Sequence, residues 1–539
     1  MKNDFLRLLP SFDVVSFDIF DTLLLRPLMD PQDVWRIVEQ ETGASGYAKA
    51  RTRADAETYA AATKRGEETT LDEAYSILPR WKELREKELE CEMRLLVANP
   101  ETVALWNEAG KLGKKRAIVS DMYLPADFVK AQLRRCGIEG WDGFFLSSER
   151  GCRKTTGALF KVMLDEMDVS PERVLHVGDN PQSDVAVPKR LGIAAAEYVK
   201  IRDRFLSDNP FVSVFLGNPA DLNRRRIAGA LMLGWHLYRC DHPDASYWER
   251  LGFLFGGVLG MAYLSFVAET AQNNGIRQLL FVARDGWLME QMFLKIAPNI
   301  ATRYVYAPRG LAGAASEKER KSYAEYIQSL KLDDTPLGIV DSNTIHFSAQ
   351  RLVSTALGRP VFGIYSVAFR PVENGVCFCY SPNMTLRWPN FAEFLFSAPT
   401  PPVSGVEKGG PVFRANLTEE ERRRIALYPE VAKGAMASFR TLLSHGISLS
   451  LETWLDWFDA FAANLSEEDQ KQLATIPHGE NAEHTHLVPV ITNGPPDSRW
   501  RCKRGIPIVK RKRFRRGLRL VTEDYLFGLI KYWEREGDF

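Results

Sequence analysis

Four short segments in the first third of the chain each carry a group that phosphoryl chemistry on an aspartate requires. In chain order they are Asp18-Ile-Phe-Asp21-Thr22, Ser120 at the end of a strand-like run, Lys154, and Gly178-Asp179-Asn-Pro-Gln-Ser-Asp184. The apolar run that precedes Asp18 predicts a strand that delivers this carboxylate to the carboxyl end of a sheet, where open α/β sheets bind ligands. We therefore interpret Asp18 as a nucleophile.

The other three segments supply what such a nucleophile needs. A carboxylate that attacks a phosphate meets a dianion, so the site must contain a cation and a lysine. Asp179 is a second hard oxygen ligand and with Asp18 would hold Mg²⁺. Lys154 would offset the negative charge, and Asp184 would orient Lys154 or a Mg²⁺-bound water. Ser120 would donate its hydroxyl to a phosphoryl oxygen, and together these residues predict a phosphate-transfer site.

These motifs, matched in order over residues 13–192, resemble those of the haloacid dehalogenase (HAD) superfamily. The resemblance implies an α/β fold with a Rossmann-like sheet and a Mg²⁺-dependent phosphatase or phosphotransferase that acts through an aspartyl-phosphate. It implies three metal-binding positions, which are Asp18, Phe20 and Asp179.

One position departs from the superfamily pattern. Its phosphatases carry a second aspartate, the general acid/base, two residues after the nucleophile, where this chain has Phe20. General acid/base catalysis is typically worth ~10²–10⁴-fold in rate, so the departure leaves three alternatives open: a phosphatase with Asp21 as substitute acid, a noncatalytic HAD-like scaffold or binding protein, and a carbon–halogen or carbon–phosphorus hydrolase. Asp21 could equally be a turn-capping residue.

Residues 28–100 have helical patterning and resemble the helical cap of the first HAD cap class, which closes over the active site. Asp30-Pro31 predicts one helix start, and Thr70-Leu-Asp-Glu73 predicts a capping box at another. Four basic residues of this insert either meet a charged substrate or form a solvated face: Arg51, Arg53, Lys64 and Arg65.

The middle of the chain predicts a second α/β unit with a parallel sheet. Its expected strands are 279–283, 304–306, 337–340 and 361–367. Polar residues follow two of them, Arg284-Asp285-Gly286 and Asp341-Ser342-Asn343-Thr344. These residues could form an anion site together with Arg284 or Arg309. Alternatively, Ser342 or Asn343 caps a helix that starts near Ile345.

An uncharged segment, 251–268, is about long enough to cross a bilayer. It contains several glycines and leads through Asn273-Asn274-Gly275 into a buried strand pattern, which favours a helix packed on a sheet. A membrane span is the alternative.

Composition predicts a multidomain globular protein in the cytoplasm. The 539 residues are 45% hydrophobic and 26% charged, with a formal net charge of +1 that argues against overall affinity for nucleic acid. The seven scattered cysteines show no zinc-binding spacing, which is typical of reduced thiols, and no secretory signal is recognisable at the start.

The last part of the chain, 376–539, predicts mainly helices and ends in a basic segment. Residues 499–519 include eleven Lys or Arg and no acidic residue. Such a segment could bind an anionic membrane surface, placing the protein at the inner face of the membrane; it could also bind nucleic acid or form a solvated face.

The predicted domains are therefore 1–200 (HAD-like, with its cap), 201–375 (a second Rossmann-like α/β domain) and 376–539. The Phe-Asp-Ile-Phe-Asp-Thr-Leu start together with Ala283-Arg284-Asp285-Gly286 also resembles bacterial HAD-like proteins associated with surface-polysaccharide assembly. This second resemblance implies that the phosphorylated small-molecule substrate is a sugar phosphate or a glycan-related metabolite.

Overall fold

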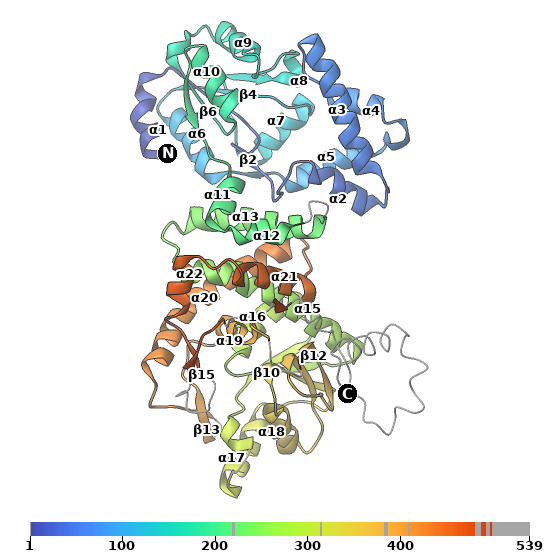
Figure 1. Ribbon diagram of the computed structural model, residues 1–539, viewed down its shortest axis with the longest axis vertical. Coiled ribbons are helices and arrows are strands. Elements are labelled where there is room, and N and C mark those ends of the chain that lie inside the picture. The colour runs from blue at the N-terminus through green and yellow to red at the C-terminus, as the bar shows by residue number, and fades with distance from the viewer. Residues whose placement is uncertain are drawn as a thin grey trace. The chain divides into compact units, whose positions relative to one another are not determined.

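The computed structural model describes residues 2–217, 221–312, 315–381, 386–407, 410–479, 487–491 and 496–497. By their internal contacts these residues form two compact units (Figure 1). Unit 1 comprises residues up to 245 together with 440–447, and unit 2 comprises 246–439 and the described residues after 447. The basic segment 499–519 lies outside the described residues, so its binding to a membrane stays a prediction, as do the domain boundaries at 200 and 375.

Unit 1 contains a parallel sheet, which confirms the predicted fold class. Its strands, in spatial order, are β5 (Gly143–Leu146), β4 (Lys115–Ser120), β1 (Val14–Phe17), β6 (Val174–Gly178) and β7 (Ala194–Glu197). Strand β1 is central, with Phe17 beside Ile118 on one side and Val177 on the other. Because parallel strands end at one edge, the residues that follow β1, β4 and β6 start close together.

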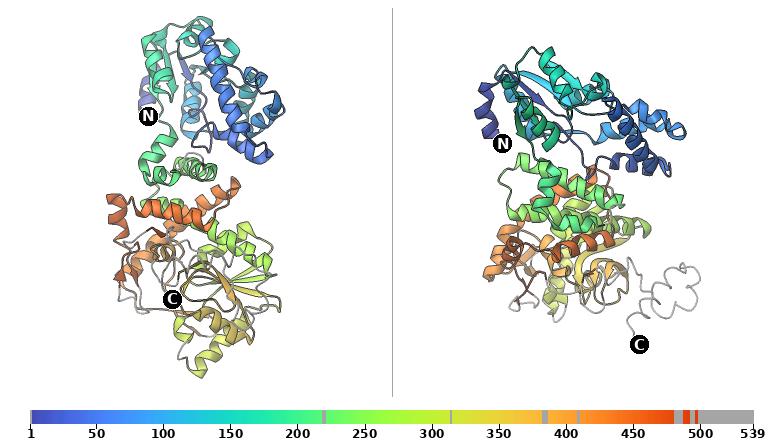
Figure 2. Two further views of the ribbon diagram at one scale, coloured as in Figure 1. Left: turned by 45° about the vertical axis from the view of Figure 1, so that its right-hand side comes forward. Right: turned by 45° about the horizontal axis from the view of Figure 1, so that its top comes forward.

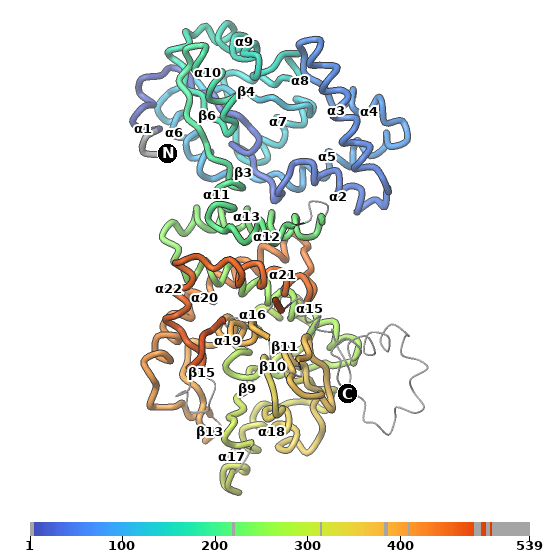
Figure 3. Tube along the Cα trace, in the orientation of Figure 1, coloured from blue at the N-terminus to red at the C-terminus, as the bar shows by residue number. Residues whose placement is uncertain are grey.

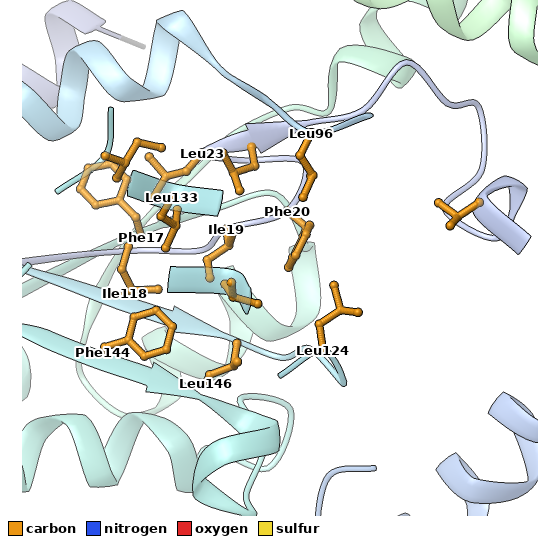
Figure 4. Close-up of a cluster of buried hydrophobic side chains, with 14 of the residues drawn as sticks. Phe17, Ile19, Phe20, Leu23, Leu96, Ile118, Leu124, Leu133, Phe144 and Leu146 are labelled. Carbon is orange, nitrogen blue, oxygen red and sulfur yellow. The ribbon is translucent and has the colours of Figure 1, made fainter. Parts of the chain in front are cut away.

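Helices cover both faces of this sheet (Figure 1). On one face, α1 (Lys2–Leu8), α6 (Pro100–Lys111) and α7 (Ala126–Arg135) pack on an apolar cluster that includes Phe17, Ile118 and Phe144. On the other, α9 (Ala158–Glu166) and α10 (Val187–Arg190) pack on Val14, Ala117 and Val119. Figure 4 shows that Phe17, directly before Asp18, and Ile19 and Phe20, directly after it, belong to the first cluster. The apolar core thus anchors both sides of the Asp18 loop.

A helical insert follows β1, as predicted (Figure 3). It lies between two short antiparallel strands, β2 (Leu24–Leu25) and β3 (Val97–Ala98). Its helices are α2 (Asp33–Thr42), α3 (Tyr47–Arg65), α4 (Leu71–Ser76) and α5 (Leu84–Leu95). The capping box between Thr70 and Glu73 is confirmed. The predicted start at Asp30-Pro31 is wrong: Asp30 accepts a hydrogen bond from the Gln32 N–H, and the helix begins at Asp33.

The rest of unit 1 consists of helices that follow β7. Their bounds are α11 (Ile201–Asp208), α12 (Phe211–Leu216) and α13 (Leu222–Asp241). Helix α13 packs against the loop after β2, because a Cβ on Gly229 would lie 2.3 Å from the carbonyl oxygen of Pro27. These helices therefore belong to the same compact body as the sheet.

Unit 2 contains the second parallel sheet that the sequence predicts (Figure 2). In spatial order its strands are β12 (Gly375–Tyr380), β11 (Phe362–Ala368), β10 (Leu337–Thr344), β8 (Gln278–Val282) and β9 (Ala301–Val305). Helices α17 (Glu317–Ser329) and α18 (Ser348–Leu357) share a core with one face. Aromatic contacts join the other face to α15 (Gly257–Asn273) and α16 (Gly286–Ile296).

The uncharged segment is a buried helix. Residues Tyr247–Asn273 form the one helix of the described chain that is long and apolar enough to cross a membrane, and 89% of its most apolar stretch is buried inside the protein. Its glycines permit a close approach, as predicted, but to a helix: a Cβ on Gly252 would lie 2.0 Å from the Val431 carbonyl oxygen of α20 (Glu419–Ser444). Burial therefore explains the hydrophobicity of this segment.

The last described part of the chain is mainly helical, as predicted, but not entirely. It contains α19 (Pro389–Leu395), α20, α21 (Leu451–Ala462) and α22 (Glu467–Leu473), and the short strand pairs β13 (Val403–Glu407) with β14 (Gly410–Phe413) and β15 (His478–Gly479) with β16 (Leu487–Val488). Strand β12, which extends the sheet to residue 380, was missed by the sequence analysis. Its run Gly-Val-Cys-Phe-Cys-Tyr is buried but short, and it lies directly after a turn.

Candidate functional site

Asp18 and Asp179 follow the neighbouring strands β1 and β6, and both are buried. The backbone N–H of Asp18 donates to the carbonyl oxygen of Val177 at 2.9 Å, which holds the nucleophile loop against β6. Carboxylate oxygens of Asp18, Asp179 and Asp184 all lie within 4.8 Å of one another. The structure therefore brings together the three carboxylates that the sequence singled out.

Lys154 connects two of these carboxylates. Its Nζ lies 2.6 Å from Asp18 Oδ1 and 2.5 Å from Asp184 Oδ1. The backbone N–H of Lys154 donates to Asp121 Oδ1 at 2.7 Å, which fixes the loop before α9. The predicted role of Asp184, to orient Lys154, agrees with these contacts.

Asp184 is held in place from three directions. It lies in a π-helical turn, Pro181–Ala186, and its Oδ2 accepts the backbone N–H of Asn180 at 2.9 Å. Its Oδ1 lies 3.1 Å from Nε2 of His176, which is buried on β6. A Cβ on Gly178 would lie 2.4 Å from the Asp184 carboxyl carbon, so glycine at the end of β6 lets this side chain fold back over the strand.

Asp179 has partners that the sequence analysis did not include. Its Oδ1 accepts a hydrogen bond from the Thr22 hydroxyl at 3.0 Å. Its Oδ2 lies 2.8 Å from Nζ of Lys200, the residue before α11, and Lys200 also lies 3.8 Å from Asp21 Oδ2. Thr22 thus ties the loop after the nucleophile to the loop after β6.

The charges in this cluster shift one another's protonation. Burial raises the pKa of Asp18, as do Asp184 and Asp179, against the opposing effect of Lys154. Burial also disfavours the charged forms of Asp184 and Lys154, but the neighbouring charges together outweigh it: Lys154 and His176 lower the pKa of Asp184, and Asp18, Asp184 and Asp121 raise that of Lys154. Lys154 and Asp184 therefore form a stable ion pair, whereas Asp18 is held beside other negative charges.

The residues fit a bound divalent cation. Three buried carboxylates face two ammonium groups, those of Lys154 and Lys200, so one negative charge remains unbalanced. Asp18, Asp179 and Asp184 could hold a metal ion, and their hard oxygens are the ligands that Mg²⁺ prefers. Phe20, at the third predicted metal position, could offer only its backbone carbonyl oxygen.

Lys200→Met is expected to tighten Mg²⁺ binding by about fivefold, because the Lys200 ammonium competes with a cation for Asp179 and a partly exposed ion pair is worth about 1 kcal/mol. Isothermal titration calorimetry with Mg²⁺ would measure this change. Arg202→Met is the matched control, since the Arg202 side chain is exposed and pairs with Asp203. Unchanged or weaker Mg²⁺ binding by Lys200→Met would contradict the competition.

Phe20 and Asp21 occupy different environments. The Phe20 side chain is buried in the apolar cluster of Figure 4, and the Arg26 guanidinium lies over its ring at 4.5 Å from the centroid. Asp21 adopts a left-handed backbone conformation, φ 56°, which aspartate tolerates better than most residues. Its side chain is 35% exposed, and burial of the remainder raises its pKa. A carboxyl group with a raised pKa suits a proton donor.

Asp21 lines a pocket of unit 1. The pocket lies beside the loop after β1 and is lined by Asp21, Arg26, Leu28, Met29, Pro31, Lys200, Ile201, Arg202 and Met232. Arg26 is held there by a bidentate ion pair with the buried Glu92, at 2.8 and 3.0 Å. Three cations, Arg26, Lys200 and Arg202, thus line this pocket beside Asp21, and each of them also pairs with a carboxylate: Glu92, Asp179 and Asp203, respectively.

Ser120 is buried at the last position of β4, which lies next to β1. The structure therefore places it at the same sheet edge as Asp18, as predicted. Asp121, which follows it and accepts the Lys154 N–H, was not singled out from the sequence. Thr22, His176 and Lys200 were also missed; a hydroxyl directly after Asp21 and a histidine inside an apolar strand were the available signals, whereas nothing around Lys200 distinguishes it from a surface lysine.

Comparison with solved structures finds similarity over 34–37% of the chain. L-2-haloacid dehalogenase from Xanthobacter autotrophicus, with chloropropionic acid covalently bound, is 18% identical, covers 37% of this chain and 83% of its own, and gives a TM-score of 0.28. Another L-2-haloacid dehalogenase is 16% identical over 35% of this chain and 85% of its own, with a TM-score of 0.28. An uncharacterized protein from Listeria monocytogenes serotype 4b is 16% identical over 34% of this chain and 76% of its own, with a TM-score of 0.21.

The comparison with curated proteins gives no match. The family model of the haloacid dehalogenase-like hydrolases matches residues 12–192, the segment that contains the four motifs and the aspartate–lysine cluster. This agrees with the resemblance over residues 13–192. Residues 12–192 therefore form a haloacid dehalogenase-like hydrolase domain.

Proposed function

We propose that this domain hydrolyses or transfers phosphate from small phosphorylated metabolites, in a Mg²⁺-dependent reaction with Asp18 as nucleophile. The observation that supports this proposal best is the buried group of Asp18, Asp179 and Asp184, with Lys154 in contact with two of them. Such a group is suited to bring a carboxylate close to a phosphate dianion.

In the proposed reaction, a carboxylate oxygen of Asp18 attacks phosphorus, and the bond from phosphorus to the leaving alcohol oxygen breaks. The leaving oxygen takes a proton from Asp21, whose pKa is raised by burial. Water then attacks the aspartyl-phosphate and gives a proton to Asp21, which releases inorganic phosphate and restores Asp18. In a phosphotransferase, a second alcohol takes the place of water.

Side chains of the protein neutralise the negative charge of the nucleophile and of the phosphoryl group during these steps. Lys154 stays paired with Asp184 and neutralises the nucleophile and the transferring group, and the Ser120 hydroxyl donates to a phosphoryl oxygen. Mg²⁺ held by Asp18, Asp179 and the backbone of Phe20 would supply further positive charge to the phosphoryl oxygens. Arg26, Lys200 and Arg202 in the adjacent pocket suit an anionic substrate, and the polysaccharide-related resemblance suggests that it is a sugar phosphate.

A panel of sugar phosphates is expected to yield inorganic phosphate with Mg²⁺ and at least ~10²-fold less with excess EDTA, since metal stabilisation of phosphoryl charge is worth several kcal/mol. Phosphate release from the sugar phosphates would be measured colorimetrically. In parallel, 2-haloacids would be tested as substrates by measuring the halide that is released. Phosphate release that persists in EDTA would refute the metal requirement, and no release from any ester would refute phosphatase activity on this substrate class.

A second candidate, hydrolysis of a carbon–halogen bond, is favoured by two observations. Phe20 replaces the general acid that an alcohol leaving group needs, whereas a leaving halide needs no proton. Lys200, at 2.8 Å, already neutralises Asp179 without a metal ion. Halide release that does not change on addition of EDTA, without phosphate release from esters, would favour this candidate. Release of neither product would favour the noncatalytic scaffold.

A further inference from the structure

In the second sheet, the direction in which successive strands are added reverses between β8 and β10. From β8 the chain continues to β9 on one side, whereas from β10 it continues to β11 and then β12 on the other side. In open parallel sheets, this switch point, at the carboxyl ends of the two strands, is where ligands bind. The mechanism proposed for unit 1 uses no residue of this region.

Polar side chains gather at this switch point. Asp285 lies just after β8, and the Ser342 hydroxyl at the end of β10 donates to one of its carboxylate oxygens. Asn343 donates from Nδ2 to the carbonyl oxygen of Pro389 at 2.9 Å and to Glu393 Oε1 at 3.2 Å. The ends of β8, β10 and the start of α19 are therefore joined by polar contacts.

These polar residues are not helix caps. The prediction that Ser342 or Asn343 caps a helix near Ile345 is wrong, because β10 continues to Thr344 and α18 begins only at Ser348. Asp285 occupies the N-cap position of α16, yet its side chain makes no capping hydrogen bond. The first N–H groups of the eleven-residue helix α16 thus face the switch point without a side-chain cap.

Three arginines, Arg284, Arg309 and Arg424, lie near the acidic residues of this switch point. Burial and the nearby positive charge of Arg284 lower the pKa of Arg424 to about 10, against the opposing effect of Glu393 and Asp285. Burial raises the pKa of Asp341 to about 6, against the opposing effect of the positive charge of Arg309. In the described part of the chain, none of these arginines lies within 4.0 Å of a carboxylate oxygen. Arg424 lies over the ring of Phe394 and donates to the carbonyl oxygen of Pro477 at 3.5 Å, and guanidinium groups are well suited to bind phosphate.

Two buried polar atoms at this edge have no partner. Ser366 on β11 is 1% exposed, and its hydroxyl makes no hydrogen bond. The register pairs Asp341 with Tyr365 and Asn343 with Val367, so Ser366 lies beside Ser342 and projects from the same face of the sheet. Asn343 Oδ1 also lacks a donor. Unpartnered buried polar groups are uncommon and point to a bound molecule.

We propose that unit 2 contains a second ligand site at the carboxyl ends of β8 and β10, which binds the phosphate group of a small phosphorylated molecule. The phosphate would lie between Arg284 and Arg424 at the N-terminus of α16, where backbone N–H groups and the helix dipole favour an anion. Ser342, Asn343 and Ser366 would contact the rest of the ligand, and Asp285 and Glu393 would accept its hydroxyl groups.

The test is binding of methylenediphosphonate, a non-hydrolysable diphosphate, to the full chain in EDTA, measured by isothermal titration calorimetry. The Lys154→Met variant weakens anion binding by the hydrolase domain, and any binding that Arg26, Lys200 and Arg202 retain there should not respond to substitutions in unit 2. In that background, Arg284→Gln with Arg424→Gln is expected to weaken binding at least about tenfold, as loss of charge-assisted hydrogen bonds does. The exposed Arg320→Gln on α17 is the matched control and should bind unchanged.

A further variant avoids a folding defect. Arg309 is exposed, so Arg309→Glu should fold normally, and reversal of its charge is expected to weaken binding about fivefold or more. The proposal would be overturned if both Arg309→Glu and the double arginine variant bound diphosphonate as tightly as the Lys154→Met background, and also if Lys154→Met alone lost all binding. When Arg284→Gln and Arg424→Gln are made in the chain that keeps Lys154, phosphate-ester hydrolysis should stay unchanged, which separates this site from the proposed function of unit 1.

Discussion

Replacement of Asp18 by asparagine is expected to lower kcat for phosphate-ester hydrolysis by about 10⁴-fold or more, a size typical for the loss of a catalytic nucleophile. The amide is nearly the same shape, and its oxygen can still accept a hydrogen bond from Lys154, now 2.6 Å from Asp18 Oδ1. It is a poor nucleophile, however, and cannot form the acyl phosphate. Steady-state assays with Mg²⁺, together with mass spectrometry of enzyme quenched during turnover, would measure kcat and the phosphorylated peptide.

The control for this variant is Asp13→Asn. Asp13 also belongs to unit 1 and pairs with a cation, Arg173, at 2.6 Å, but the two side chains are 55% and 45% exposed. Exposed pairs contribute little to stability, so Asp13→Asn should keep full activity. Equal turnover in wild type and Asp18→Asn would remove Asp18 from the mechanism.

Three of the four motifs could be predicted from the sequence by a local rule, whereas Lys154 was predicted from the charge that the chemistry requires. A buried apolar run predicts a strand, and a polar residue directly after it predicts a position at the sheet edge. In parallel sheets those edges coincide, so Asp18 and Asp179 could be placed together although 161 positions separate their numbers. The same rule placed Ser120, at the end of β4, beside them.

Partners that come from outside a strand end could not be predicted in this way. Lys200 reaches Asp179 from the loop before α11, and only the folded chain brings its ammonium group within 2.8 Å. Likewise, β10 continues through Asp341-Ser342-Asn343-Thr344, a sequence with the composition of a turn. Pairing with β11 along this stretch overrides the local preference of these residues.

Arg51 shows how tertiary structure can reverse a reading based on charge. The sequence placed it either against a charged substrate or on a solvated face, and both alternatives are wrong, because its side chain is fully buried. Glu88, also fully buried, accepts two hydrogen bonds from Arg51, at 2.9 and 3.0 Å. Arg53, Lys64 and Arg65, by contrast, are exposed, as the alternative of a solvated face predicts.

Glu88 is the centre of the buried polar network of the helical insert. Besides the two bonds from Arg51, its oxygens accept bonds from the side chains of Trp35, Tyr47, Tyr75 and Tyr123, at 3.1, 3.0, 2.8 and 3.1 Å. These partners come from α2, α3, α4 and the loop after β4, so one carboxylate connects the insert to the sheet domain. The network thereby fixes the insert to the sheet domain within unit 1.

Glu88→Ala is expected to destabilise this insert by about 3–5 kcal/mol, because it leaves the buried Arg51 charge with only the longer contact to Asp55, at 3.4 Å, and several donors without an acceptor. Hydrogen exchange measured by mass spectrometry should show amides of α3 and α5 exchanging at least ~10²-fold faster, since 1.4 kcal/mol corresponds to a factor of ten. Glu57→Ala is the matched control: Glu57 pairs with Arg53 on the exposed surface of α3 and should change stability by less than ~0.5 kcal/mol. If Glu88→Ala exchanged no faster than Glu57→Ala, apolar packing rather than this carboxylate would hold the insert together.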